Sequence, residues 1–411
     1  MPPPEQLSRP PRFAHAVAVL FGAHAAGLLV PLLTVPWLAR TLSPAGWAPV
    51  LVAQALAGWA ILVLEFGFDL AGTRDVAQAA SGASLARTAA AVQRARFMLT
   101  PLVAAGVVGA ARLLGHEPRL IAGTVGYVVA RGLSPYWFFQ GTQRIRFAAA
   151  IETAGKLLPA AALFALVRRP DDGWRVLVLQ AIGAGVATVL LTWRMHRQHI
   201  LPAVSTREAF AALRAAAPMF GARAASGLYM QANLLILSAA APVAAVAAFG
   251  GAERIVRAAI NLLTPLTQAF FPRISMLAKE SPVRALAEIR RTLAILVGLA
   301  LCGALVTALF GDTVVRVLLG PLYASSVPVL RLLVLVMPLV AAGTVLGIYW
   351  ALPWRRERLF LAAVIVGGAV NLLLAVLLVP RHGAMGMAIA VVSAESCVTA
   401  LLAVAFLRSR R

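Results

Sequence analysis

The side chains most able to do chemistry in this chain are charged residues that fall inside long apolar stretches. Six of them are basic: Arg131, Lys156, Arg223, Arg254, Arg257 and Arg331. Each Arg or Lys near the centre of a membrane helix costs about 2.5–3.5 kcal/mol. Together they cannot face lipid, so they must pair internally or face a wet cavity. An excess of positive charge in such an interior favours an anion such as phosphate or pyrophosphate, which guanidinium groups bind in bidentate fashion.

Helical spacing offers carboxylate partners to some of these cations. Glu253 precedes Arg257 by four residues, and Glu152 precedes Lys156 by the same spacing. Glu before a cation at this spacing is the favourable orientation for an ion pair on one helix. One interpretation is therefore that these four residues neutralise each other as packing pairs.

Two of the cations lack a carboxylate one turn away. Arg254 falls near the middle of its apolar stretch, and Arg223 has no acidic residue within one turn. Snorkelling or a distant partner is the alternative to a ligand role for both. Arg131 and Arg331 lie nearer to the ends of their stretches, from which a long side chain can reach the headgroups.

Carboxylates and amides inside or at the rim of the apolar stretches are candidates for ion coupling. The titratable candidates are Glu65, Asp69, Glu253 and Glu395, and the amides Asn233 and Asn371 could coordinate a cation. A coupling proton or sodium ion stays open, and an intramembrane Asn also commonly joins two helices by hydrogen bonds. No other cofactor is expected.

The remaining residues do not indicate catalysis. The six histidines are scattered without metal-ligand spacing, and the two cysteines, Cys302 and Cys397, lie far apart in apolar runs. No Gly-rich phosphate loop is present. A membrane polymerase or transferase would need a large outer loop with paired catalytic residues, and the expected outer loops are short. We therefore expect a protein that is not an enzyme.

Composition places these residues in a bilayer. The 411 residues are 61% hydrophobic and 13% charged, far from the average of soluble proteins. The net charge of +22 would indicate nucleic-acid binding in a soluble chain, but here the basic residues are spread thinly between apolar runs. The chain is therefore expected to be an all-α integral membrane protein.

Twelve runs are long enough to cross the hydrocarbon core as helices. They lie at roughly 15–39, 46–68, 97–114, 119–140, 148–167, 174–193, 216–240, 243–271, 291–311, 326–351, 358–380 and 384–407. With the N-terminus in the cytoplasm, the inner segments hold about three times as many basic residues as the outer ones, as the positive-inside rule requires. We expect a multi-pass protein of the bacterial inner membrane with both termini cytoplasmic.

An internal repeat predicts two lobes. The segment that begins Tyr136-Trp137 matches the segment that begins Tyr349-Trp350 at an offset of half the chain. Six helices per half give both halves the same orientation, so the pseudo-twofold axis runs along the membrane normal. We expect an N-terminal lobe at 1–200, a C-terminal lobe at 201–411, and a central cavity suited to alternating access.

The ordered motifs resemble those of the Wzx-type polysaccharide flippases of the multidrug/oligosaccharidyl-lipid/polysaccharide exporter superfamily. They are Pro31–Arg40 with Leu42–Trp47, Glu65–Phe68 with Thr73–Ala77, Trp137–Gly141, Ala252–Ile255, Pro272–Ser275, Leu319–Tyr323, Asn371 and Gly383–Gly386. Gln143 stands where that family usually has an acidic residue. The resemblance spans nearly the whole chain.

The resemblance implies a transporter that flips an isoprenoid-pyrophosphate-linked oligosaccharide to the outer leaflet for O-antigen, capsule or exopolysaccharide assembly. The partners it implies are that lipid-linked oligosaccharide, the bilayer and other polysaccharide assembly proteins. It also implies a cationic lumen. Arg254 and Arg223 are then the first candidates for anion ligands, and the weaker candidates are Arg257, Arg131, Lys156 and Arg40.

Other functions share some of these features. A multidrug antiporter of the same superfamily would have the same helices, but an acidic or apolar cavity for cationic drugs. A flippase for a lipid-linked peptidoglycan precursor would need two further helices. A membrane polymerase or transferase is the alternative from a different class of protein.

Overall fold

Every regular element in the described part of the chain is helical. The computed structural model describes the backbone of residues 11–409, and the side chains of these residues except 11–29, 222, 225–231, 264–265, 267–269, 271–272 and 279. The elements are α1 (Pro11–Glu65), α2 (Ala71–Ala77), α3 (Gly82–Leu113), α4 (Pro118–Gly132), α5 (Tyr136–Gly141), α6 (Ile145–Leu166), η1 (Pro170–Asp172), α7 (Gly173–Gln198), α8 (Thr206–Ala240), α9 (Val243–Leu262), α10 (Thr264–Glu280), α11 (Pro282–Leu309), α12 (Gly311–Leu318), η2 (Pro321–Tyr323), α13 (Ser326–Leu333), α14 (Val336–Thr344), η3 (Val345–Ala351) and α15 (Glu357–Arg408). The all-α prediction is confirmed.

The two longest helices are each broken by one residue. In α1 the break is Ser43, with φ of 57°, directly before Pro44. In α15 it is Gly383, with φ of 52°. A positive φ cannot continue a right-handed helix, so the chain turns at both places. These turns separate the first two and the last two of the apolar runs expected from the sequence.

Seven helical stretches among the described residues are long and apolar enough to cross a membrane. They are 30–65, 82–113, 145–166, 170–198, 282–309, 326–351 and 357–408. The first and last of these contain the turns at Ser43 and Gly383 and so have two arms each. The count of twelve spans stays a prediction.

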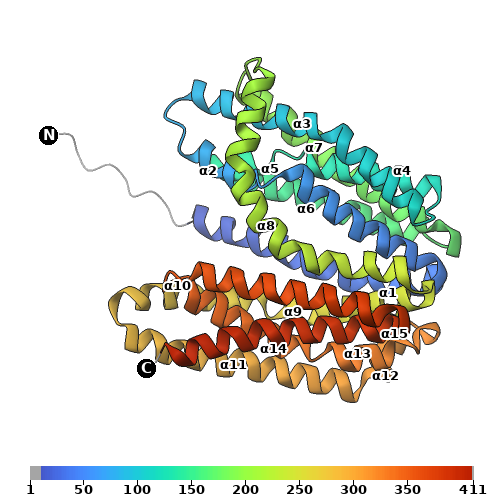
Figure 1. Cartoon of the computed structure of the whole chain (residues 1–411). Coiled ribbons are helices and arrows are strands. Elements are labelled where there is room, and N and C mark those ends of the chain that lie inside the picture. Colours follow the sequence, from blue (N-terminus) through green and yellow to red (C-terminus); the bar gives the residue numbers. More distant parts are fainter. Residues whose placement is uncertain (1–10, 410–411) are drawn as a thin grey trace.

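The helices lie in two groups with α8 passing between them (Figure 1). We call α1–α7 the first group and α9–α15 the second group. α8 contacts α3 and α1 of the first group and α15 of the second. The predicted lobe boundary at 200 falls just before α8, although the first half of this helix packs on the first group.

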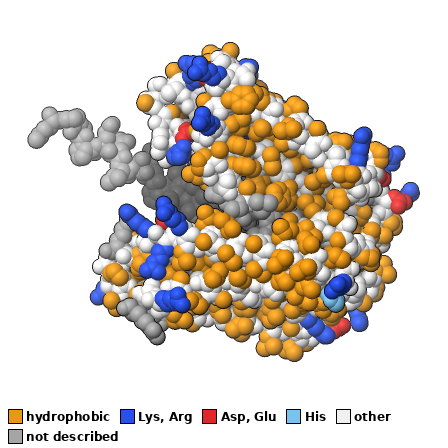
Figure 2. All heavy atoms as spheres, viewed as in Figure 1, with side chains coloured by type: hydrophobic (Ala, Val, Ile, Leu, Met, Phe, Trp, Pro, Cys, Tyr) orange, Lys and Arg blue, Asp and Glu red, His pale blue; other side chains and the backbone are white. Residues whose placement is uncertain are grey.

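The surface has the pattern of a membrane protein (Figure 2). Apolar side chains cover the visible flank, and Lys and Arg gather towards its two ends. Large apolar side chains are also widely exposed in the molecule, among them Leu102, Leu158 and Val189 at 66–72%, as expected of a surface that lipid covers. The start of α1 and the end of α15 lie at the same end of the bundle (Figure 1).

The two groups touch closely along α1 and α9. A Cβ at Gly250 of α9 would stand 2.6 Å from Leu51 Cδ1 of α1, and one at Gly251 would stand 3.4 Å from the Trp47 ring. Both glycines are buried. The small residue at Gly250 lets α9 approach α1 closely, because a larger one would displace the Leu51 side chain.

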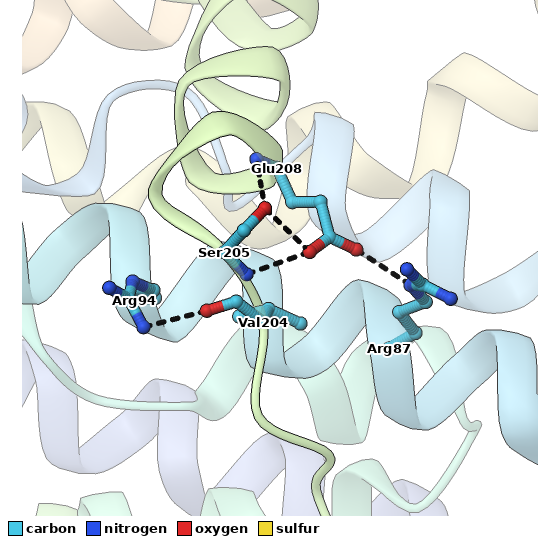
Figure 3. Close-up of polar contacts among 5 residues, drawn as sticks. All are labelled: Arg87, Arg94, Val204, Ser205 and Glu208. Atoms are coloured by element: carbon cyan, nitrogen blue, oxygen red, sulfur yellow. Dashed lines mark hydrogen bonds and ion pairs between the residues drawn. The ribbon is translucent and has the colours of Figure 1, made fainter.

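The start of α8 is fastened to α3 (Figure 3). Ser205 and Glu208 form a capping box, and the Glu208 carboxylate also accepts a hydrogen bond of 2.7 Å from Arg87 Nε. These hydrogen bonds lower the pKa of Glu208 to about 2, so it stays charged at any pH above that value. Arg94 Nη1 donates to Val204 O at 2.6 Å. Further along α8, Phe220 stacks on Phe66 with 4.5 Å between ring centres.

Each tryptophan of the two repeated Tyr-Trp pairs is buried and lies close to an arginine. Trp137 is 2% exposed and Trp350 is 1% exposed. Arg96 Cζ lies 5.7 Å from the ring centre of Trp137, and Arg356 Cζ lies 5.0 Å from that of Trp350. The segment that carries Trp137 is the short helix α5, and Trp350 lies in the π-helical turn η3. This likeness fits an internal repeat.

Candidate functional site

A polar cavity of about 270 Å³ lies inside the first group and is closed by one residue of the second. α1, α4, α6 and α7 form its walls, and Arg254 of α9 reaches into it from the other group. The charged and amide residues among its described lining are Gln54, Arg131, Glu152, Lys156, Gln180 and Arg254. We call this space the junction cavity. It brings together three of the predicted anion ligands, Arg131, Lys156 and Arg254, which come from three different helices.

Arg131 is held between two carboxylates. Its Nη1 lies 3.8 Å from Glu65 Oε1 and 3.8 Å from Glu152 Oε1. Glu152 also accepts a hydrogen bond of 2.8 Å from the Ser134 hydroxyl. The charge of Arg131 is therefore balanced by its neighbours, which leaves it less able to attract a cargo anion than an unbalanced cation.

Lys156 is the cation of the junction cavity that has no neighbour to neutralise it. Among the described residues it makes no hydrogen bond or ion pair. Pairing with Glu152, which helical spacing made possible, is not what the structure has, because Glu152 turns to Ser134 and Arg131. Gly155, beside it on α6, lets α7 approach closely, since a Cβ at Gly155 would stand 2.9 Å from Gly183 O.

Arg254 is oriented by amides and not by a carboxylate. Its Nη2 donates to Gln54 Oε1, and Gln54 Nε2 donates in turn to Gln180 Oε1 at 3.3 Å. An amide partner fixes the direction of the guanidinium without cancelling its charge. Lys156 and Arg254 thus give the junction cavity an unbalanced positive charge, as expected for an anion site.

A second pocket of about 170 Å³ lies between α8 and helices α9, α13, α14 and α15 of the second group. Its polar lining is Asn233, Glu253, Arg257, Asn261 and Glu395. Glu253 Oε1 accepts hydrogen bonds from Arg257 Nη2 at 2.7 Å and Nε at 3.1 Å. The ion pair expected from helical spacing is therefore present. We call this space the paired pocket, because its cation is bound to a carboxylate of the same helix.

Of the candidates for ion coupling, three meet in the paired pocket: Asn233, Glu253 and Glu395. Asn233 is 2% exposed, and its Oδ1 has no hydrogen-bond partner among the described residues. Asn371 is 1% exposed but does not line this pocket. Their role in ion coupling stays a prediction.

The other predicted site residues lie outside both spaces. Arg223 of α8 forms an ion pair with Asp69, just beyond the end of α1. Arg40 donates to Arg316 O and Val317 O at the end of α12, where a cation meets the negative end of a helix. Both residues join parts of the chain that lie far apart in sequence, and neither lines the junction cavity.

Comparison with known proteins identifies the family. Residues 13–278, more than half of the chain, match the model of the family described as "Polysaccharide biosynthesis protein". The chain belongs to this family. Two curated relatives carry the name "Putative O-antigen transporter". The one from Shigella dysenteriae is 27% identical over 92% of this chain and 96% of its own, and the one from Escherichia coli (strain K12) is 26% identical over 91% and 92%.

Solved structures with the same fold are membrane transporters. The chain is similar to the lipid II flippase MurJ in an inward closed conformation, with a TM-score of 0.78 and 11% identity over 96% of this chain and 87% of that one. It is also similar to a multidrug resistance MATE family transporter in an inward-facing conformation, with a TM-score of 0.69 and 16% identity over 96% and 97%. The predicted superfamily fold is confirmed, and the names of the relatives indicate transport and not catalysis.

One buried cation of this polysaccharide biosynthesis protein escapes sequence reasoning. Arg96 is not among the six basic residues that the sequence places inside apolar stretches, but it lies inside α3 and is 1% exposed. Its Nη1 donates to Ser134 O at 2.9 Å, and its Cζ lies 5.8 Å from the ring centre of Phe68. It therefore supports the wall that positions Ser134 and Glu152. The spacing of Ala89, Val92 and Arg96 on one helical face was the signal that could have found it.

Proposed function

We propose that this chain flips an isoprenoid-pyrophosphate-linked oligosaccharide from the inner to the outer leaflet of the bacterial cytoplasmic membrane, for surface polysaccharide assembly. The observation that carries this proposal is the junction cavity, in which Lys156 and Arg254 face one space and neither is bound to a carboxylate of the described part of the chain. A pyrophosphate needs such a site, because strong charge-assisted hydrogen bonds replace the water it loses. The relatives named as O-antigen transporters support the same cargo class.

Alternating access is supported by the way in which the two groups meet. On one side of the cavity, Arg40 binds the end of α12 and the Tyr323 hydroxyl donates to Ala39 O at 3.1 Å. Trp47 and Tyr323 meet edge to face there, with 5.7 Å between ring centres. With both termini cytoplasmic, these contacts close the outer side, and cargo enters from the inner leaflet.

The membrane potential supports outward transport. Moving one charge across the membrane is worth about 2.3 kcal/mol per 100 mV. With the cytoplasm negative, the pyrophosphate is driven outward. A coupling ion then has only to supply the remaining free energy of transport, and we propose that this ion binds in the paired pocket.

The proposal is tested by deletion and complementation. Deleting the gene should remove the surface polysaccharide and cause lipid-linked oligosaccharide to accumulate at the inner leaflet. Arg254→Ala should insert normally and fail to restore export, whereas Arg254→Lys should restore part of it because the charge remains. Unchanged surface polysaccharide after deletion would refute the function, and near-normal export by Arg254→Ala would refute the site.

The same strain separates this function from drug export, which the MATE-like fold also allows. A cationic drug is repelled by an unbalanced positive cavity. We therefore expect deletion to leave sensitivity to cationic drugs unchanged. Greater sensitivity with intact polysaccharide would favour the antiporter.

A further inference from the structure

A second basic hollow lies at the edge of the first group, where α6 begins and α7 ends. It has a volume of about 500 Å³ and is lined by Phe139, Arg144, Arg146, Phe147, Arg194 and Gln198. We call it the rim pocket. It shares no lining residue with the junction cavity, and its residues have no part in the function proposed above.

The rim pocket concentrates positive charge. Its described lining holds three arginines and no carboxylate. Arg194 is further held in place by Phe147, since its Cζ lies 5.5 Å from that ring centre. A neighbouring arginine, Arg197, lies 4.7 Å from the ring centre of Trp193 in the same way. Guanidinium groups fixed on aromatic rings keep their donors directed outward, which favours phosphate binding.

The pocket lies at the boundary between apolar flank and basic end. Phe147 of α6 is 44% exposed and Trp193 of α7 is 50% exposed. The large exposed side chains that precede Trp193 on α7 include apolar ones such as Val189, which is 66% exposed. Exposed aromatic side chains beside basic ones are typical of the headgroup region of a bilayer. The positive-inside rule assigns this end to the cytoplasmic leaflet.

We propose that the rim pocket binds the headgroup of an anionic glycerophospholipid of the inner leaflet. The phosphate would meet Arg144, Arg146 and Arg194, and the acyl chains would lie along the exposed side chains of α6 and α7. Gln198 adds a preference for a hydroxylated headgroup, because its Oε1 is buried without a hydrogen-bond partner among the described residues. A glycerol hydroxyl can donate to that oxygen, so phosphatidylglycerol fits the pocket.

The test is native mass spectrometry of the purified full chain with added phosphatidylglycerol. Arg144→Gln, Arg146→Gln and Arg194→Gln combined should weaken retention of this lipid about tenfold or more, because each basic residue near the headgroups contributes to the attraction. A matched control removes three exposed arginines from the opposite end, Arg112→Gln, Arg119→Gln and Arg168→Gln, and should bind as the unchanged chain does. Arg194→Lys alone should keep most of the affinity.

Three outcomes would overturn the proposal. The first is equal retention by the triple variant and the control. The second is equal loss of phosphatidylcholine, which would mean a general loss of lipid contact. The third is loss of added isoprenoid pyrophosphate with phosphatidylglycerol retained, which would make the pocket an entry point for cargo. A thermal unfolding curve close to that of the unchanged chain shows that the triple variant is folded.

Discussion

The junction cavity and the paired pocket lie on two sides of α9, and two consecutive residues of this helix, Glu253 and Arg254, each line one of them. Arg254 faces the junction cavity and is held by an amide, whereas Glu253 faces the paired pocket and is bound to Arg257. Successive residues on a helix point about 100° apart, so one turn of α9 can serve both spaces. The difference lies in the partner, because a carboxylate cancels the charge of a cation and an amide only directs it. The net charge in each space therefore depends on whether the partner of each arginine is a carboxylate or an amide, and not on the number of arginines alone.

The largest effect on cargo binding and export is expected from reversing the charge of Lys156, the cation of the junction cavity that has no partner among the described residues. Lys156→Glu should abolish binding of an isoprenoid pyrophosphate in nanodiscs and abolish export, because the cavity loses its positive excess. The protein should still fold, since Lys156 makes no hydrogen bond or ion pair with the residues that the structure describes. Lys156→Arg is the control and should retain binding. Export by Lys156→Glu at the normal rate would remove the distinction between the two spaces.

An intermediate effect is expected from removing the amide that directs Arg254. Gln54→Ala should weaken binding of the same probe roughly tenfold, because a hydrogen bond to a charged group contributes about 1.5–3 kcal/mol. Gln54→Glu sharpens the point, since it keeps a hydrogen bond but adds a carboxylate. We expect Gln54→Glu to bind the probe more weakly than Gln54→Ala. Tighter binding of the probe by Gln54→Glu than by Gln54→Ala, measured by titration, would show that the orientation of the Arg254 guanidinium matters more than the charge balance of the cavity.

The smallest effect on cargo is expected in the paired pocket. Glu253→Gln with Arg257→Gln replaces an ion pair by two amides and leaves the junction cavity intact. Affinity for the isoprenoid pyrophosphate should change by no more than about threefold, because surface or half-exposed pairs contribute little. If the paired pocket holds the coupling ion, export should fall although binding persists. A large loss of binding would instead place the cargo on both sides of α9.

Sequence alone predicted the elements and part of the site. Apolar runs gave the all-α fold, and the ends of those runs fell where Ser43 and Gly383 turn the chain. The pair of Glu253 and Arg257 was predictable because helical geometry alone brings residues four apart together. That Arg254 needs something other than a carboxylate of its own turn was also predictable.

What could not be predicted depends on contacts between distant segments. Glu152 had two possible cation partners, and only the packing of α4 and α6 on the same helix, α7, brings it to Arg131 and not to Lys156. Asp69 meets Arg223 across 154 positions of sequence, which no local pattern records. Arg96 lies just before the third apolar run read from the sequence, which begins at about residue 97, so no local pattern marks it as buried. Its contacts with Phe68 and Ser134 make an arginine inside α3 tolerable.

The attachment of α8 at both ends has a consequence for how the chain can be made. Its start is fixed to α3 through Glu208 and Arg87, and its far part packs on α15. A break in the backbone between α7 and α8 would leave a first fragment in which Phe66 and Asp69 lack their partners on α8. The second fragment would carry α8 without the helices α1 and α3 on which it packs. The first six runs are thus completed only when the ribosome has delivered α8, so the two halves of this transporter are tied together during biogenesis as well as in the finished protein.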